Sequence, residues 1–131
     1  MIVAGFHHVE LWVADASGFG AWAWLLDRLG FTLDQEWTGG RSWAAEDAYL
    51  TLTTSPNLTA SEHDRRRPGL NHLAFHGGDR DAVDALMRAA AGNGWTPLYD
   101  ERYPHAGGPG HYAGWLENED GFKVEVVADP E

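Results

Sequence analysis

FHHVELW at residues 6–12 and LNHLAFH at residues 70–76 are two copies of one pattern, separated by 64 residues. Each copy has a histidine in its third position. The same offset holds further along the chain, where His8 falls on His72, Asp15 on Asp79, Gly30 on Gly94 and Phe31 on Trp95. A constant register of this kind predicts two copies of one supersecondary unit, and an internal repeat determines the fold before any single residue is interpreted.

The first unit is expected to open with a strand that has two different faces. Alternation puts apolar residues on one face and leaves His8, Glu10 and Trp12 on the other. Apolar residues at helical spacing follow, from a predicted cap at Ser17 to a stop at Gly30. Short strands are then predicted over residues 32–37, 41–45 and 48–53.

The second unit repeats this order. A strand around His72 is followed by a predicted helix over 81–91, which ends at a Gly-Asn-Gly sequence. Strands are expected over 96–99, 112–117 and 122–127, with a long glycine-rich loop over 100–110 between the first two. The chain is therefore predicted to be one α+β domain with two tandem βαβββ modules, which form a curved mixed sheet around a central site. Module one spans 1–55, a linker spans 56–68 and module two spans 69–131.

Composition excludes several classes of function. The chain has no cysteine, so a metal could be bound only by nitrogen and oxygen. A net charge of −11 argues against a nucleic-acid partner, which requires a basic face. No apolar stretch is long enough to span a membrane, and the N-terminus has no signal-peptide pattern, so we expect a cytoplasmic location.

Three residues on matching strand faces suggest a metal site. His8 and His72 lie on the faces away from the predicted helices, and alternation along the last strand puts Glu125 on the same face. His7 is the competing histidine of the first strand, but it shares the apolar face and is expected to pack on the helix side. Two imidazoles and one carboxylate suit a single Zn, Fe, Mn, Co or Ni ion.

The two histidine motifs and the closing sequence NEDGFKVE at 118–125 resemble the vicinal oxygen chelate superfamily, which includes glyoxalase I, extradiol dioxygenases and bleomycin-resistance proteins. The resemblance covers nearly the whole chain. It implies a glyoxalase-like fold, commonly within a homodimer, and a metal bound by His8, His72 and Glu125. It also implies that this metal acts as a Lewis acid on vicinal oxygens of a small molecule.

Departures from individual members of the superfamily leave the reaction open. Extradiol dioxygenases typically have a tyrosine ten residues before the closing glutamate, where this chain has Trp115. Glyoxalase I normally has a glutamate in the last strand of its first unit, but this chain has Tyr-Leu-Thr-Leu at 49–52. The four-ligand set of glyoxalase I is incomplete here unless Glu10 substitutes.

Other residues are candidates for catalysis or for the walls of a substrate pocket. Glu10 is placed to be a fourth ligand, an acid–base residue or a partner of a ligand, and His111 and Tyr112 beside the glycine-rich loop are candidate proton donors. The predicted pocket residues are Trp12, Trp43, His76, Tyr103 and Trp115. Each aromatic residue could equally pack in the core, and the loop could equally be a surface turn.

Two classes of function follow. One is a metal-dependent lyase, isomerase or dioxygenase-type enzyme that acts on a small oxygenated molecule. The other is a non-catalytic protein that sequesters an antibiotic, as bleomycin-resistance proteins do. The histidine and glutamate set favours the enzyme, whereas the seven tryptophans and the negative charge favour the binding protein.

Overall fold

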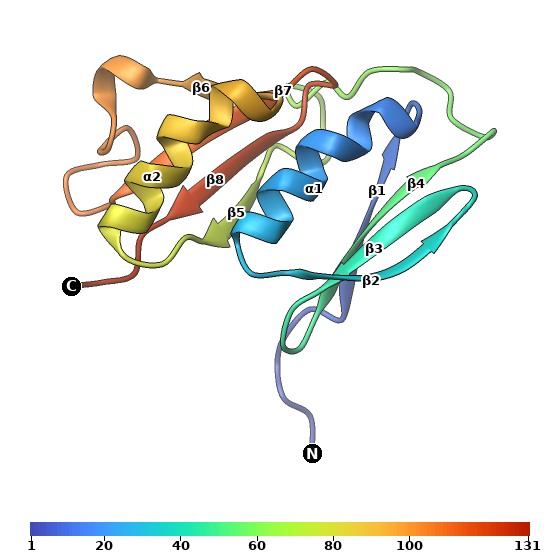
Figure 1. Cartoon of the computed structure of the whole chain (residues 1–131), viewed down its shortest axis with the longest axis horizontal. Coiled ribbons are helices and arrows are strands. Elements are labelled where there is room, and N and C mark those ends of the chain that lie inside the picture. The colour runs from blue at the N-terminus through green and yellow to red at the C-terminus, as the bar shows by residue number, and fades with distance from the viewer. The chain divides into compact units, whose positions relative to one another are not determined.

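The computed structural model describes all of residues 1–131 and divides into two compact modules, residues 1–62 and 63–131. Each module contains one α-helix and one four-stranded mixed sheet (Figure 1). The predicted α+β fold of two βαβββ modules is confirmed, and neither sheet closes into a barrel. The segment 56–68, predicted to connect the modules, is divided between them at residue 62.

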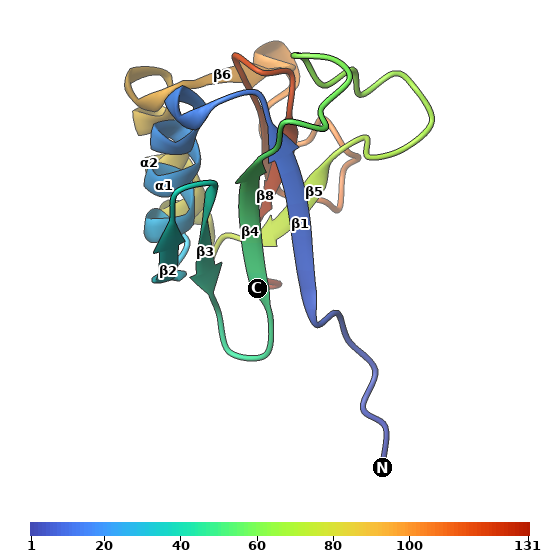
Figure 2. The same ribbon diagram turned by 90° about the vertical axis from the view of Figure 1, so that its right-hand side faces the viewer.

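The sheet of module one has the strand order β1-β4-β3-β2 (Figure 2). Its first and last strands, β1 and β4, pair in parallel, and the other neighbours are antiparallel. The elements are β1 (His8–Val13), α1 (Phe19–Arg28), β2 (Thr32–Trp37), β3 (Gly40–Ala44) and β4 (Tyr49–Thr54).

Module two has the equivalent order, β5-β8-β7-β6, and again its first and last strands pair in parallel. The elements are β5 (Leu73–His76), α2 (Arg80–Ala90), β6 (Trp95–Leu98), β7 (Ala113–Asn118) and β8 (Lys123–Val127). Short 3₁₀ turns lie at Ala16–Gly18, Ala91–Asn93 and Asp100–Arg102. All predicted strands and helices are present, with ends that differ by one residue or a few.

The repeat is visible in the residues that precede and follow the two helical segments. Asp15 accepts a hydrogen bond from the Ser17 amide, and Asp79, its counterpart 64 residues later, accepts one from the Ala82 amide. Gly30 and Gly94 follow the two helical segments with φ values of 92° and 91°, which side chains disfavour. The prediction that Ser17 caps the first helix was wrong. Ser17 lies within the 3₁₀ turn that precedes α1, and its hydroxyl donates to Asp15.

Alternation along the strands separates an apolar face from a polar one. In β1, Leu11 and Val13 are buried whereas Trp12 between them is 43% exposed. In module two, buried residues of α2 and of β7 and β8 form the apolar layer; they include Val83, Leu86, Leu116, Val124 and Val126. The polar groups of each strand are thereby left on the opposite face of the sheet.

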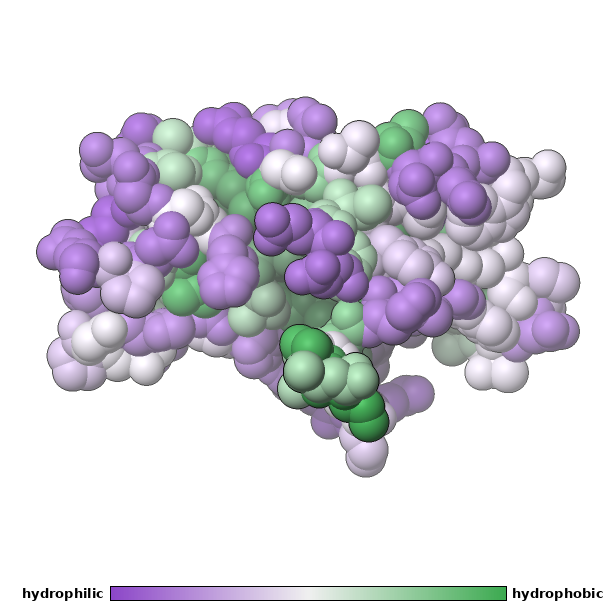
Figure 3. All heavy atoms as spheres, turned by 90° about the horizontal axis from the view of Figure 1, so that it is seen from below, coloured by the Kyte–Doolittle hydropathy of each residue, from purple (hydrophilic) through white to green (hydrophobic).

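The N-terminal segment before β1 is apolar and exposed. Met1, Ile2, Val3 and Phe6 each expose more than four-fifths of their surface. The N-terminus lies at the bottom of Figure 1. Seen from below, a group of apolar residues faces the reader (Figure 3). No helix is both long and apolar enough to cross a membrane.

Gly121 provides a test of the turn that leads into β8. Its φ is +87°, and a Cβ atom added there would collide with the His63 carbonyl. Gly121→Ala should therefore lower the free energy of unfolding by about 1–3 kcal/mol, measured by urea denaturation. Gly92→Ala is the matched control, because its Cβ would meet nothing within 4 Å and its φ is not in the left-handed region. Equal stability of the two variants would contradict this account of the turn.

Candidate functional site

The polar face of the first sheet carries a cavity of about 350 Å³. His8, Glu10, Asp34, Ser42, Tyr49 and Thr51 are among the residues that line it. The His8 ring stacks on Tyr49, with 4.7 Å between the ring centroids. Glu10 accepts a hydrogen bond of 2.7 Å from the Trp12 indole. Module one therefore presents one imidazole and one oriented carboxylate on the face away from its apolar core.

Module two presents a second set of donors around Glu125. This carboxylate is only 5% exposed, although it has no lysine or arginine within ion-pair distance. His72 Nε2 lies 3.5 Å from one of its oxygens, Oε1. His111 Nε2 contacts the other oxygen, Oε2, at hydrogen-bonding distance. A buried carboxylate is thus faced by two imidazoles, one at each oxygen.

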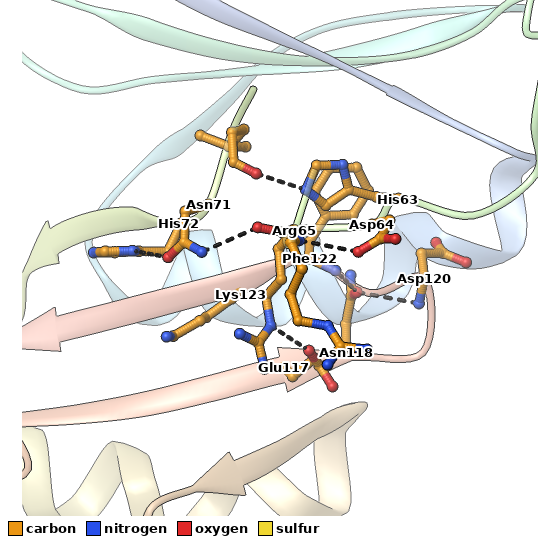
Figure 4. Close-up of polar contacts among 12 residues, drawn as sticks. His63, Asp64, Arg65, Asn71, His72, Glu117, Asn118, Asp120, Phe122 and Lys123 are labelled. Carbon is orange, nitrogen blue, oxygen red and sulfur yellow. Dashed lines mark hydrogen bonds and ion pairs between the residues drawn. The ribbon is translucent and has the colours of Figure 1, made fainter. Parts of the chain in front are cut away.

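The neighbours of Asn71 define which nitrogen of His72 carries a proton. The Asn71 side-chain amide nitrogen donates to the Arg65 carbonyl at 3.1 Å, so its carbonyl oxygen must be the atom that faces His72 (Figure 4). That oxygen can only accept, and it lies 2.7 Å from His72 Nδ1. In the neutral imidazole, Nδ1 therefore carries the hydrogen and Nε2 offers a lone pair toward Glu125.

This arrangement fits a divalent cation. His72 Nε2 and Glu125 Oε1 are then two acceptors that face each other at 3.5 Å with no hydrogen between them. Two ligands of a tetrahedral ion, each about 2.1 Å from the metal, lie about 3.4 Å apart. As the side chains stand, no group of three His, Asp or Glu residues is arranged to hold a metal ion. The fit to a cation therefore rests on His72 and Glu125 alone. His111 does not add a third ligand, because its Nε2 contacts Oε2 of Glu125.

The structure brings further residues to the same face of module two. Trp115 pairs with Glu125 across β7 and β8, and its ring contacts His72 edge-on at 4.9 Å between centroids. Lys123, two residues before Glu125, places its ammonium 4.7 Å from the centre of the Trp115 ring. Tyr99 accepts a hydrogen bond of 2.9 Å from that ammonium. Sequence reasoning missed Tyr99 and Lys123 as site residues, although the same alternation that selected Glu125 also selects Lys123.

Two predicted site residues lie elsewhere. Tyr112, a predicted proton donor, and Tyr103, a predicted pocket residue, both donate hydrogen bonds to Asp84 on α2, of 2.6 and 2.5 Å. Alternation explains this difference for Tyr112, because Ala113 and Trp115 share the Glu125 face and the residue before Ala113 therefore points to the helix side. The two tyrosines attach the loop that carries His111 to helix α2. Asp84, which sequence reasoning also missed, is the shared acceptor.

Three other residues complete the comparison with the sequence. Trp43 was predicted to line a pocket, but it is 3% exposed and pairs with Leu50, on the face opposite Ser42 and Thr51. It belongs to the core. His76 is exposed at the end of β5, on the same strand face as Ala74, the residue that pairs with Glu125. His7 was expected to pack on the helix side, but it is exposed and its Nδ1 lies 2.9 Å from Nδ1 of His8.

The register shows how the carboxylates of the two modules correspond. Glu125 pairs with Ala74 in module two. The residue 64 positions before Ala74 is Glu10, and Glu10 pairs with Thr51. Thr51 is therefore the module-one counterpart of Glu125, and the carboxylate of module one lies directly across the strand pair from it.

Residues 5–126 match the family described as the Glyoxalase/Bleomycin resistance protein/Dioxygenase superfamily. The chain belongs to this superfamily, which confirms the resemblance drawn from the two histidine motifs.

Individual relatives agree with this assignment. The uncharacterized protein YqjT of Bacillus subtilis (strain 168) is 40% identical over 124 residues, which cover 93% of this chain and 97% of YqjT. A protein of Bacillus halodurans, provisionally described as a glyoxalase, has a crystal structure that matches with a TM-score of 0.88 and 39% identity over 94% of both chains. Lactoylglutathione lyase of Agrobacterium tumefaciens matches with a TM-score of 0.63 and 19% identity over 96% of this chain and 94% of the lyase, which is a likeness of fold alone.

Asp84 offers a test of the loop anchor. The hydrogen bonds from Tyr103 and Tyr112 lower the pKa of Asp84 below its usual value of 3.8. A lowered pKa stabilises the fold above pH of about 4, and this contribution is lost as the pH falls through the folded-state value. Asp84→Asn should cost about 1 kcal/mol of unfolding free energy at pH 7, and the difference from the wild type should shrink below about pH 4. Denaturant titrations at several pH values measure both effects.

Asp81→Asn is the control for this experiment. It makes the same change of charge in the first turn of the same helix, at an exposed residue that accepts no tyrosine hydroxyl. A loss of stability as large as that of Asp84→Asn would show that the helix charge, and not the tyrosine contacts, is responsible.

Proposed function

We propose that this protein is a metal-dependent enzyme that acts on a small oxygenated molecule, with one divalent ion held by His8, His72 and Glu125. The observation that carries the proposal is the pair in module two, where the lone pair of the neutral His72 imidazole and an oxygen of the buried Glu125 carboxylate face each other at 3.5 Å. Zn, Fe, Mn, Co and Ni all suit two nitrogens and one oxygen. Bound there, such an ion supplies Lewis acidity toward substrate oxygens.

The chain's own residues prepare the donors for this role. Asn71 holds His72 with Nε2 free to bind, and His111 takes Oε2 of Glu125, which leaves Oε1 for the ion. Partners of this kind fix the orientation of ligands in metalloproteins. Glu10 is the carboxylate available from the polar face of module one and is held by Trp12. We assign it to proton transfer or to a fourth ligand position.

The relatives support an enzyme without naming its reaction. The superfamily's description joins glyoxalases and dioxygenases with bleomycin-resistance proteins, and one structural neighbour with a defined activity is a lactoylglutathione lyase of low identity. Trp115 stands where dioxygenases of the superfamily typically have a tyrosine, which favours lyase or isomerase chemistry. We also propose a cytoplasmic homodimer, the arrangement common in this superfamily.

Antibiotic sequestration is the second candidate function. Trp37, which lines the module-one cavity, is 46% exposed, and Trp12 is 43% exposed. Exposed tryptophans on a polar sheet face provide apolar walls for a planar ligand. Quenching of tryptophan fluorescence by stoichiometric bleomycin, without formation of a product, would favour this function over the enzyme.

Metal content tests the main proposal. Purified wild-type protein loaded with Zn(II) and passed through a desalting column should retain about one ion per site, as measured by elemental analysis. His72→Ala and Glu125→Ala should each remove it, because either change leaves the module-two pair with a single donor. His76→Ala is the control, since it deletes an exposed histidine of the adjacent strand β5 and should retain the ion. Unchanged zinc in both ligand variants would refute the site.

Asn71 allows a finer test of how the site is prepared. Asn71→Ala removes the acceptor for His72 Nδ1 and should weaken Zn(II) binding by about 10–100-fold, measured by competition with a chromophoric chelator. Asn71→Asp retains an acceptor oxygen and should restore most of the affinity. If the two variants bind zinc equally well, Asn71 does not orient His72.

A further inference from the structure

Lys123 is a buried cation with no anionic partner. It is the only lysine of the chain and is 9% exposed. Its ammonium donates to the Tyr99 hydroxyl at 2.9 Å, and no carboxylate lies within ion-pair distance. A buried charge is costly unless it is paired, so an ammonium whose hydrogen-bond partner is a neutral phenol retains a strong affinity for an anion.

Tyr99 holds a strained backbone conformation beside this ammonium. It is the one residue other than glycine with positive φ, at 57°. Strained residues gather at functional sites, because elsewhere the cost of about 1–3 kcal/mol brings no benefit. The hydrogen bond from Lys123 is also the main cause that lowers the pKa of Tyr99, and the nearby charges of Lys123 and Arg65 act in the same direction. The surroundings of this hydroxyl therefore favour negative charge.

Trp115 adds a free hydrogen-bond donor. Its Nε1 atom is buried and has no hydrogen-bond partner. Its ring contacts Lys123 on one side and His72 on another, and Tyr99 lies edge-on at 6.1 Å between ring centroids. Since Trp115, Tyr99 and His72 are each partly exposed, a small molecule can reach this group of residues from solvent.

We propose that Lys123, Tyr99 and Trp115 form a subsite that binds the carboxylate group of a small organic acid, next to His72 and Glu125. This inference rests on the proposed function, for which it names the substrate class: an acid whose carboxylate is held by Lys123 while its oxygens reach the metal position. The two aromatic rings provide flat apolar contact for the carbon skeleton beside that carboxylate.

The local charges agree with an anionic ligand. The chain as a whole has a charge of −11. Around Tyr99, however, three cations gather: Lys123, Arg65 and Arg102, whose guanidinium lies 5.0 Å from the centre of the Tyr99 ring. Glu117 pairs with Arg65 at 2.8 Å (Figure 4), and Glu101 pairs with Arg102 at 3.5 Å, so Lys123 is the one of the three without a carboxylate partner. The unpaired ammonium of Lys123, with two further cations near it, favours an anion at this position of an otherwise acidic protein.

Benzoate and benzamide are the probes, because they have nearly the same shape and differ in charge. Protein labelled with ¹³C at the lysine ε carbon gives one signal, since Lys123 is the only lysine. Benzoate should shift this signal saturably, and benzamide should not. The titration is run on the full chain, both after chelator treatment and after loading with Zn(II), so anion binding is measured independently of the metal.

Variants define the contribution of each group, measured by calorimetric titration with benzoate. Lys123→Met should lower the affinity at least about tenfold, while leaving thermal stability unchanged or raised, because a buried unpaired charge is removed. Lys123→Arg should retain part of the affinity, and Tyr99→Phe should lower it several-fold. Arg66→Met, which removes an exposed cation of the same sign, is the control and should bind benzoate normally.

The outcomes separate this inference from the proposed function. An unshifted lysine signal, an equal shift with benzamide, or normal benzoate binding by Lys123→Met would each overturn the subsite, even if zinc binds as expected. Absence of zinc together with charge-selective benzoate binding would leave the subsite standing and overturn the metal-dependent enzyme. Because the labelled wild-type protein gives the first answer, the test does not depend on whether any variant folds.

Discussion

Each module depends on the parallel pairing of its first strand with its last. β1 pairs with β4 and β5 with β8, although about 35 or more residues separate the strands of each pair. A parallel pair requires a long crossover, which the helix and the intervening strands supply. Alternation then puts one set of side chains under the helix and the other on the free face. The histidine before β5 and the carboxylate of β8 meet because this pairing fixes their register.

The same register explains why the two modules do not offer identical chemistry. The positions equivalent to Glu125 and Ala74 are Thr51 and Glu10, so the carboxylate has exchanged strands between the two modules. Paired residues on one face lie about 5 Å apart. The exchange therefore keeps a carboxylate at nearly the same place on the polar face of module one, but β1 supplies it instead of the last strand. Trp12 then holds Glu10 from the same strand. This register is the basis for our proposal that Glu10 replaces the glutamate that glyoxalase I normally carries.

Much of the fold was predictable from the sequence because its determinants are local and repeated. Asp15 caps the 3₁₀ turn that leads into α1, Asp79 caps α2, and Gly30 and Gly94 share one left-handed conformation, so a 64-residue offset was enough to locate the elements. The site was less predictable. Tyr103 lies in an irregular loop, where alternation assigns no face, and Tyr112 lies just before β7, on the face opposite Glu125. Both donate to Asp84 on α2, a contact that no sequence pattern indicates. Tyr99 was missed because its role depends on a positive φ and on Lys123 of another strand.

The polar contacts of module two bear on two residues that the sequence analysis assigned to different roles, Glu125 to the metal and His111 to proton donation. In the structure these two residues contact each other, and they differ in how they face His72. When the His72 imidazole is neutral, its Nε2 and Glu125 Oε1 face each other at 3.5 Å without a hydrogen between them, whereas His111 Nε2 contacts Oε2 directly. A cation between His72 Nε2 and Glu125 Oε1 would stabilise the first contact, because two acceptor atoms repel each other when no cation lies between them. The second contact is satisfied by a hydrogen bond alone, and it limits Glu125 to a single free oxygen. In the metal site that we propose, His111 therefore determines which oxygen of Glu125 is free to bind, and the tyrosines that join its loop to α2 hold His111 in place.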